Sequence, residues 1–217
     1  MKERMLRVVR WLSWIGGALL GAKVLLSIGI QMWPVPTPRW ARGLLHCGWR
    51  RRYRDPERTL QLLHIQPGMR VLELGPGSGL FTPEAARLVG NSGKLLCLDL
   101  QMDMLRPLPQ QEQDAGLCNV FLAAATAEHL PFPDKSIDLA FAIAVLPMIS
   151  NKQQALHELR RVLIPDGILA VSEEVIEPEY VPALITRHWC QRAGFKLTAR
   201  IHKRLWYMLL FRPACNS

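Results

Sequence analysis

The stretch Arg70-Val71-Leu72-Glu73-Leu74-Gly75-Pro76-Gly77-Ser78-Gly79 decides the fold class of this 217-residue chain. It begins with a short apolar run, which is typical of a parallel strand covered on both faces. Glycines then stand at alternate positions, where the absence of a Cβ lets the backbone turn tightly and approach a ligand. A helix start follows at Thr82-Pro83-Glu84, with threonine as the expected N-cap. The stretch therefore predicts the first strand, loop and helix of a nucleotide-type α/β unit.

Apolar runs and helix signals alternate along the rest of the chain. After the first unit, parallel strands are expected at residues 94–100, 119–125, 137–146 and 168–172. Two further β-rich runs, 195–201 and 206–212, are joined by only four residues, as in an antiparallel pair. We therefore predict an α/β fold with a doubly wound, mostly parallel seven-stranded sheet whose last strand is antiparallel.

The N-terminal part of the chain differs in character. Residues 11–33 form an apolar run whose only charge is Lys23, and as a helix this run would be about 35 Å long, enough to span a bilayer. It predicts a membrane-associated helix preceding the α/β domain, with a Pro-rich linker up to residue 38. The expected organisation is thus residues 1–38 as a basic N-terminal segment, an apolar membrane helix and a Pro-rich linker, and residues 39–217 as the α/β domain with a basic lead-in over 39–58. Lys23 and a weak polar stripe leave open whether the helix spans the bilayer or lies in its interface. A buried helix of a soluble domain is the alternative.

The net charge of +9 is unevenly distributed. Residues 1–58 hold 12 Lys and Arg against 3 Asp and Glu, residues 59–182 have a net charge of −7, and residues 183–217 hold seven basic residues and no acid. An acidic middle argues against a nucleic-acid-binding surface, whereas basic ends fit an anionic membrane. The basic residues after the apolar run are Arg39, Arg42, Arg50, Arg51, Arg52 and Arg54. We expect this cluster to face lipid headgroups on the cytoplasmic side.

The motifs limit the class of ligand that the glycine loop can bind. The glycine loop is neither Gly-x-Gly-x-x-Gly nor a P-loop. Pro83 removes one N–H from the helix start and Glu73 would repel a phosphate, so a positively charged nucleoside without phosphates is favoured. Asp99 ends the second expected strand, where an acid can accept two hydrogen bonds from a ribose diol. Its alternative role is to cap the following helix. The five cysteines are scattered without metal-ligand spacing, so no metal site is expected.

These segments resemble the class I S-adenosylmethionine-dependent methyltransferases over about residues 55–213, and in particular the type 11, quinone-biosynthesis group. The resemblance rests on the segments 71–79, 98–100, 127–134 and 159–167. Pro76 also resembles the loop of bacterial phospholipid N-methyltransferases. The resemblance implies a Rossmann-like fold and S-adenosyl-L-methionine as cofactor.

The resemblance also implies a cofactor-binding set. The glycine loop would lie against methionine, the end of the second strand against ribose and adenine, and the exits of the third and fourth strands against the adenine edge and the sulfonium. In that order the residues are Glu73, Gly75, Pro76, Gly77 and Gly79; Asp99, Leu100 and Met102; Thr126 and Ala127; and Ala144. Thr126 departs from the family, which often has an acid at that position.

Two acids follow the fifth expected strand, Glu173 and Glu174, and they are the candidates for acid/base catalysis, with a solvated loop as the alternative. Methyl transfer itself needs mainly in-line placement of the reacting atoms. The function we expect is a membrane-anchored methyltransferase with a cytoplasmic catalytic domain and a lipid-like or apolar small-molecule acceptor. The alternatives are a methyltransferase acting on RNA or protein, and a non-catalytic membrane-associated module that binds the cofactor.

Overall fold

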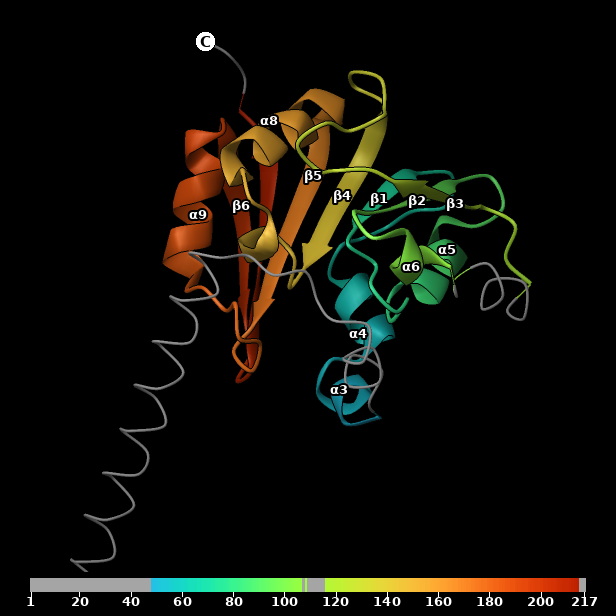
Figure 1. Cartoon of the computed structure of the whole chain (residues 1–217), viewed down its shortest axis with the longest axis horizontal. Coiled ribbons are helices and arrows are strands. Elements are labelled where there is room, and N and C mark those ends of the chain that lie inside the picture. Colours follow the sequence, from blue (N-terminus) through green and yellow to red (C-terminus); the bar gives the residue numbers. More distant parts are fainter. Residues whose placement is uncertain (1–47, 107, 109–115, 215–217) are drawn as a thin grey trace, which may run out of the picture.

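The computed structural model describes residues 48–106, 108 and 116–214. Within them, seven strands form one sheet in the order β3-β2-β1-β4-β5-β7-β6 (Figure 1). The strands are β1 (Arg70–Leu74), β2 (Lys94–Asp99), β3 (Val120–Ala124), β4 (Ile137–Ile143), β5 (Leu163–Glu174), β6 (Phe195–His202) and β7 (Trp206–Pro213). Strands β1 to β5 are parallel, and β7 is antiparallel to both of its neighbours, β5 and β6. The predicted mostly parallel seven-stranded α/β sheet with an antiparallel last strand is confirmed.

Helices cover both faces of the sheet (Figure 1). Helices α8 (Lys152–Val162) and α9 (Ala183–Arg192) pack on one face, and α4 (Pro56–Gln61) and α5 (Thr82–Val89) pack on the other. The remaining elements are α3 (Gly48–Tyr53), α6 (Met102–Leu105) and a short 3-10 turn, η2 (Leu146–Met148).

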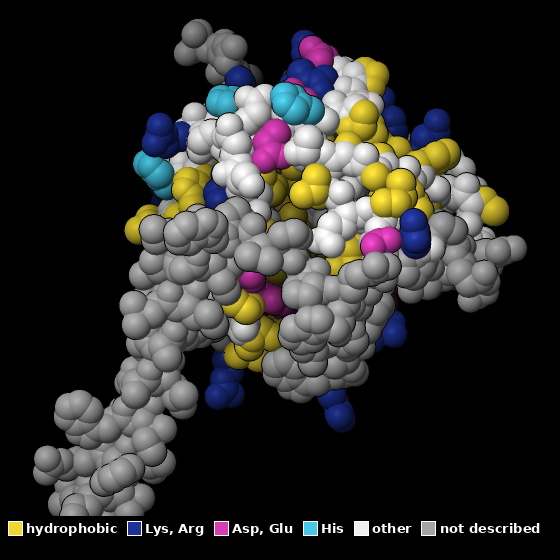
Figure 2. All heavy atoms as spheres, in the orientation of Figure 1, with side chains coloured by type: hydrophobic (Ala, Val, Ile, Leu, Met, Phe, Trp, Pro, Cys, Tyr) yellow, Lys and Arg dark blue, Asp and Glu magenta, His cyan; other side chains and the backbone are white. Residues whose placement is uncertain are grey.

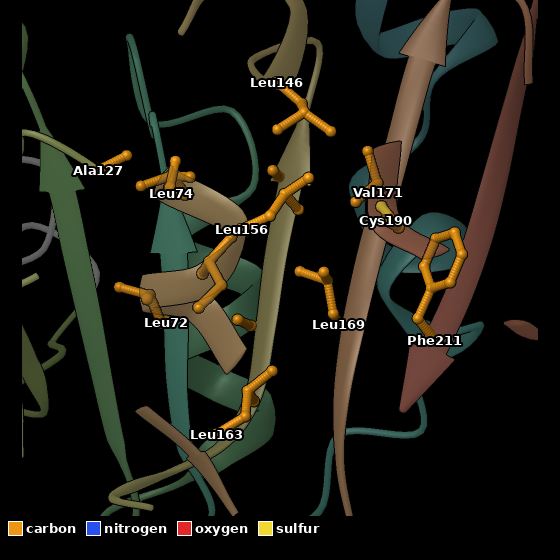
Figure 3. Close-up of a cluster of buried hydrophobic side chains, with 14 of the residues drawn as sticks. Leu72, Leu74, Ala127, Leu146, Leu156, Leu163, Leu169, Val171, Cys190 and Phe211 are labelled. Atoms are coloured by element: carbon orange, nitrogen blue, oxygen red, sulfur yellow. The ribbon is translucent and has the colours of Figure 1, made fainter. Parts of the chain in front are cut away.

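Each face of the sheet has its own buried apolar cluster. On the α8/α9 face, Leu74 and Val171 lie near Leu146 at the carboxyl end of the parallel strands, with Leu156 of α8 packed across them (Figure 3). Burying one such side chain contributes about 2 kcal/mol. The cluster therefore fixes the strand ends from which the loops of the site emerge.

Two sequence-based expectations about local structure are wrong. Phe81, not Thr82, occupies the N-cap of α5, because the Thr82 hydroxyl donates instead to the buried Glu73 carboxylate at 2.8 Å. The fifth strand, expected at residues 168–172, is longer, because α8 ends at Val162 and β5 starts at once and runs from Leu163 to Glu174. The extra residues of β5 are taken up by a register shift opposite the start of β4, where a proline without an N–H is tolerated.

The expected membrane helix at 11–33, the linker that follows it and the domain boundary at residue 38 lie outside the described residues, as do Arg39 and Arg42. In the described part of the chain, no helix combines the length and the apolar character that crossing a membrane requires.

Candidate active site

The loops that follow the parallel strands meet at the carboxyl edge of the sheet. The Gly75 N–H donates to the Leu98 carbonyl at 2.7 Å, which ties the exit of β1 to the end of β2. The Ala144 N–H donates to the Ser172 carbonyl at 2.8 Å, which ties the exit of β4 to β5. Ala144 has a positive φ of 57°, a conformation that costs an alanine about 1 kcal/mol or more and is common at functional sites. Ligands of open α/β sheets bind at this edge.

The glycine loop leaves room for a ligand. Gly75 has a φ of 66°, and a Cβ on it would lie 2.6 Å from a methyl group of Val145. Gly77 has a φ of 56°, but a Cβ on it would meet no described atom within 4 Å. The Gly79 N–H donates to the Pro76 carbonyl at 2.9 Å and closes the turn. The loop thus packs against the exit of β4 through Gly75 and borders an open space at Gly77.

Glu73 supports this loop from below. Its carboxylate is buried and accepts hydrogen bonds from the Thr82 hydroxyl and, at 3.5 Å, from the Cys97 thiol. It joins β1, β2 and the start of α5, and it brings a negative charge beneath the loop. An anionic group there favours a ligand that carries positive charge, such as an amino acid ammonium or a sulfonium.

At the end of β2, Asp99 lies between two apolar side chains. One carboxylate oxygen accepts from the Gln101 N–H at 2.9 Å, but Asp99 does not cap the following helix, because Gln101 is the N-cap of α6 and no side-chain hydrogen bond caps it. Leu100 and Met102 beside it are 69% and 54% exposed. Large apolar side chains at such exposure next to a carboxylate match the needs of a nucleoside, a flat apolar base joined to a diol.

An acid that the sequence analysis did not predict as a site residue, Glu128, lies at the exit of β3. The Thr126 hydroxyl donates to the carboxylate of Glu128, which also accepts from the Asn151 N–H at 3.1 Å. Burial alone would raise the pKa of Glu128, but the hydrogen bonds from Thr126 and from Asn151 lower it below its ordinary value. Ala127 between them packs into the core near Leu74 (Figure 3). Glu128 lies two residues after Thr126, the position at which the family often has an acid. It thus places a carboxylate close to that position.

Glu173 and Glu174 are the last residues of β5 and are fully buried, so the solvated-loop alternative is wrong. They point to opposite faces of the sheet because side chains alternate along a strand. Glu174 faces α3, where it accepts from the Arg50 guanidinium at 3.2 Å and from the Tyr53 hydroxyl at 2.5 Å. This acid is therefore occupied in holding α3 on the sheet.

Arg54 completes the α3 contact. Its Nη2 donates to the Ser172 hydroxyl at 2.5 Å, its Nε lies 3.8 Å from Glu174, and its guanidinium lies 3.7 Å from the ring centroid of Trp206. Burial lowers the pKa of Arg54 to about 10. The expectation that Arg50 and Arg54 face lipid headgroups is wrong, because the acid on β5 draws both side chains inward. Their neighbours Arg51 and Arg52 are exposed.

Glu173 faces the α8/α9 side and lacks such partners. Its Oε1 is enclosed without a hydrogen-bond partner among the described residues. Burial raises the pKa of Glu173 well above its ordinary value, and the charges of Glu174, Glu177 and Glu179 raise it further, against a smaller opposing effect of Arg54. Its burial and its acidic neighbours thus favour the protonated, uncharged form of this carboxyl group. Among the described residues, no cluster of three or more His, Cys, Asp or Glu is placed to hold a metal ion.

Comparison with known proteins agrees with this geometry. Residues 72–171 match the protein family described as "Methyltransferase domain". A Ubiquinone/menaquinone biosynthesis C-methyltransferase UbiE from Vibrio parahaemolyticus is 34% identical over 140 residues, which cover 63% of this chain and 52% of that protein. The UbiE of Teredinibacter turnerae is 39% identical over 116 residues, covering 53% and 47%. The chain thus spans about half the length of the curated relatives it matches.

Solved structures share the fold. A SAM dependent methyltransferase from Aquifex aeolicus superposes with a TM-score of 0.76 at 24% identity, covering 81% of this chain and 98% of that one. The [4+2]-cyclase SpnF superposes with a TM-score of 0.63 at 20% identity, covering 74% and 81%. Because the second protein is titled a cyclase, the fold by itself does not define the reaction.

The strand order and the glycine loop are those of a Rossmann-like fold. Residues 72–171 form a methyltransferase domain similar to that of the S-adenosylmethionine-dependent methyltransferases, and this similarity implies S-adenosylmethionine as the cofactor. The site fits that cofactor: the space at Gly77 admits a ligand backbone, the acid of Glu73 lies beneath the loop, and Asp99 stands beside the exposed Leu100.

Proposed function

We propose that this chain transfers the methyl group of S-adenosylmethionine to a carbon atom of an apolar, lipid-like small molecule at a membrane surface. The observation that carries the proposal is the character of the edge between β4 and β5. It presents Ala144, Val145 and the buried Glu173. Among the described residues, the ion pairs at this edge lie on the α3 side, where Arg50 pairs with Glu174 and Glu177 and Arg54 pairs with Glu174. An apolar molecule fits such an edge better than a charged base or side chain.

Different residues would bind the cofactor and border the transferred methyl group. S-adenosylmethionine supplies a methyl group on positively charged sulfur, and transfer breaks the sulfur–methyl bond, forms a carbon–carbon bond and releases one proton. Asp99 and the loop from Gly75 to Gly79 would hold the cofactor, with Glu73 beneath them. The exit of β4 at Ala144 and Val145 would border the methyl group and exclude water. Because the names of the similar UbiE proteins refer to C-methylation in quinone biosynthesis, a quinone-like acceptor is the substrate class that we propose.

The surface at the same edge supports a membrane-borne acceptor. Val175 and Ile176 leave β5 and are exposed, and Leu184 and Ile185 in the first turn of α9 are 73% and 40% exposed. The turn between β6 and β7 lies at this end too, because its Leu205 carbonyl accepts from the Val175 N–H at 2.8 Å.

Basic side chains accompany these apolar ones. Lys203 and Arg204 in that turn and Arg51 and Arg52 of α3 are exposed. Figure 2 shows the molecule in the orientation of Figure 1, with hydrophobic side chains gathered toward the middle of the face and most Lys and Arg around its rim. Apolar side chains among basic ones suit an anionic bilayer surface, and with the apolar run at 11–33 we propose a membrane-associated protein whose catalytic domain is cytoplasmic.

The proposal is tested with the full chain, labelled S-adenosylmethionine and an alkylated hydroquinone embedded in phosphatidylcholine vesicles, with and without phosphatidylglycerol. We expect labelled ring-methylated product, formed faster on the anionic vesicles. Leu184→Ser should slow this turnover, whereas Phe121→Ser, which removes another exposed apolar side chain, on β3, should not. Label that enters added RNA or protein but not the hydroquinone would refute the proposed acceptor class.

A further inference from the structure

One buried carboxyl oxygen, Oε1 of Glu173, receives no hydrogen bond from any described residue, and the fold itself does not explain this. Glu173 is 1% exposed, and its Oε1 has no hydrogen-bond partner among the described residues. Leaving a buried polar group unpaired costs stability. Such a group persists in a protein when a ligand supplies the missing partner.

Glu173 lies beside the edge where we propose that methyl transfer occurs, and its neighbours come from three elements. On its own strand, Val171 precedes it on the same face and packs on Cys190 of α9 (Figure 3). Across the sheet, Glu173 pairs in register with Tyr207 of β7. On the other side, the Ser172 carbonyl binds the N–H of Ala144, at the exit of β4.

Two hydroxyl groups near Glu173 already have partners. The Tyr207 hydroxyl donates to the Val181 carbonyl at 2.9 Å and lies 2.7 Å from the Thr186 hydroxyl. Tyr180 packs edge-on against Tyr207, with ring centroids 6.1 Å apart. The surroundings are thus largely aromatic and apolar, and among the described residues Glu173 Oε1 is buried in them without a hydrogen-bond partner.

We infer that the Glu173 carboxyl group binds an oxygen atom of the methyl acceptor, and that it selects apolar acceptors carrying a hydroxyl or carbonyl group close to the methylated carbon. The inference rests on the proposed function and makes its substrate class more specific. Glu174, one residue on, does not share this role because Arg50 and Tyr53 occupy it on the opposite face.

The protonation state of Glu173 suits an uncharged acceptor. The negative charges of Glu174, Glu177 and Glu179 raise the pKa of Glu173 and the positive charge of Arg54 lowers it. Burial also raises the pKa of the nearby Tyr180, Cys190 and Tyr207, which keeps these three side chains uncharged. A neutral carboxyl group can donate its O–H to a carbonyl and accept from a hydroxyl. It therefore binds both functional groups, and it does so without attracting a cation.

Three full-length variants test the inference, with decylhydroquinone, kept reduced, as the probe acceptor. Glu173→Leu removes both hydrogen-bonding functions, Glu173→Gln keeps a donor and an acceptor, and Glu179→Gln removes a neighbouring charge as the control. We expect the KM for the probe to rise about tenfold or more in Glu173→Leu and about threefold in Glu173→Gln. It should be unchanged in Glu179→Gln, and the affinity for S-adenosylmethionine should be unchanged in all three.

A second measurement does not depend on turnover. The infrared difference spectrum between wild type and Glu173→Gln, both bound to S-adenosylhomocysteine, should contain the carbonyl band of a protonated carboxyl group, and this band should shift when decylhydroquinone is added. Normal wild-type turnover with an unchanged KM in Glu173→Leu, or a band that does not move, would overturn the inference alone. If the wild-type protein neither binds nor methylates the probe, the proposed acceptor class fails and the inference fails with it.

Discussion

Arg54 donates a hydrogen bond to the hydroxyl of Ser172 at 2.5 Å, across 118 residues of sequence. The contact joins α3, where the described part of the chain begins, to the strand that carries both candidate acids. The Ser172 carbonyl also accepts a hydrogen bond from the Ala144 N–H. Ser172 therefore connects Arg54, in the lead-in segment, to the edge where we propose that methyl transfer occurs.

Replacing Arg54 should therefore destabilise the fold. Arg54→Met removes a cation that offsets the buried Glu174, and breaking a buried pair from one side costs about 3 kcal/mol or more. The free energy of unfolding in urea measures this loss. Arg51→Met, a change of an exposed side chain in α3, three residues before Arg54, should cost less than about 0.5 kcal/mol. Equal losses in the two variants would contradict the account of α3.

Asp99 should contribute to cofactor affinity. We expect Asp99→Ala to weaken binding of S-adenosylmethionine by about 1–3 kcal/mol, because charge-assisted hydrogen bonds to the ribose would be lost. Titration calorimetry measures the effect. Asp166→Ala is a suitable control, since that side chain is 92% exposed near the start of β5. Unchanged affinity in Asp99→Ala would remove this residue from the site.

The glycine loop allows a test that separates packing from ligand binding. Gly75→Ala would place a Cβ 2.6 Å from Val145 and should strongly lower the free energy of unfolding. Gly77→Ala meets no described atom and should cost only the left-handed backbone penalty of about 1–2 kcal/mol. It should nevertheless weaken S-adenosylmethionine binding markedly, because its methyl group would enter the space proposed for the cofactor. Normal affinity in Gly77→Ala would mean that the cofactor lies elsewhere.

Stability at acid pH should depend on Asp138 at the start of β4. Burial would raise the pKa of Asp138, but hydrogen bonds from the Arg70 side chain at 3.1 Å and 3.2 Å and from its N–H at 2.7 Å lower it below the ordinary value. A depressed pKa stabilises the folded state above the unfolded-state pKa of about 4, and this contribution is lost as the pH falls through the folded-state value.

Asp138→Asn should therefore reduce stability at pH 7 and flatten its decline below about pH 4. Urea unfolding across this pH range measures both effects, and Asp166→Asn should reproduce neither. A variant that keeps the steep acid decline of the wild-type protein would show that another group causes it.

The sequence predicted those parts of the structure that depend on local pattern. Apolar runs located the strands, and glycines at alternate positions located the loop after β1, because these features need only neighbouring residues. The ends of β5 and the side-chain partners of the site could not be predicted in this way. Glu174 is buried because Arg50 lies against it, and the two are 124 residues apart.

The same reason explains what was missed near the cofactor. Thr82 has the residue type and position of an N-cap, but a carboxylate nine residues earlier in the chain binds its hydroxyl. Glu128 was not predicted as a site residue, because the family resemblance points to the position of Thr126. The signal that could have found it is an acid within a few residues of the exit of the third strand.

The most direct test of the proposed activity is to incubate membranes containing the full-length protein with methyl-labelled S-adenosylmethionine and to identify the labelled product in the lipid extract. The account predicts one labelled apolar molecule that carries a hydroxyl or carbonyl group near its new methyl group, and less of that product in Glu173→Leu. Label confined to RNA or protein, or a lipid extract without label, would contradict it.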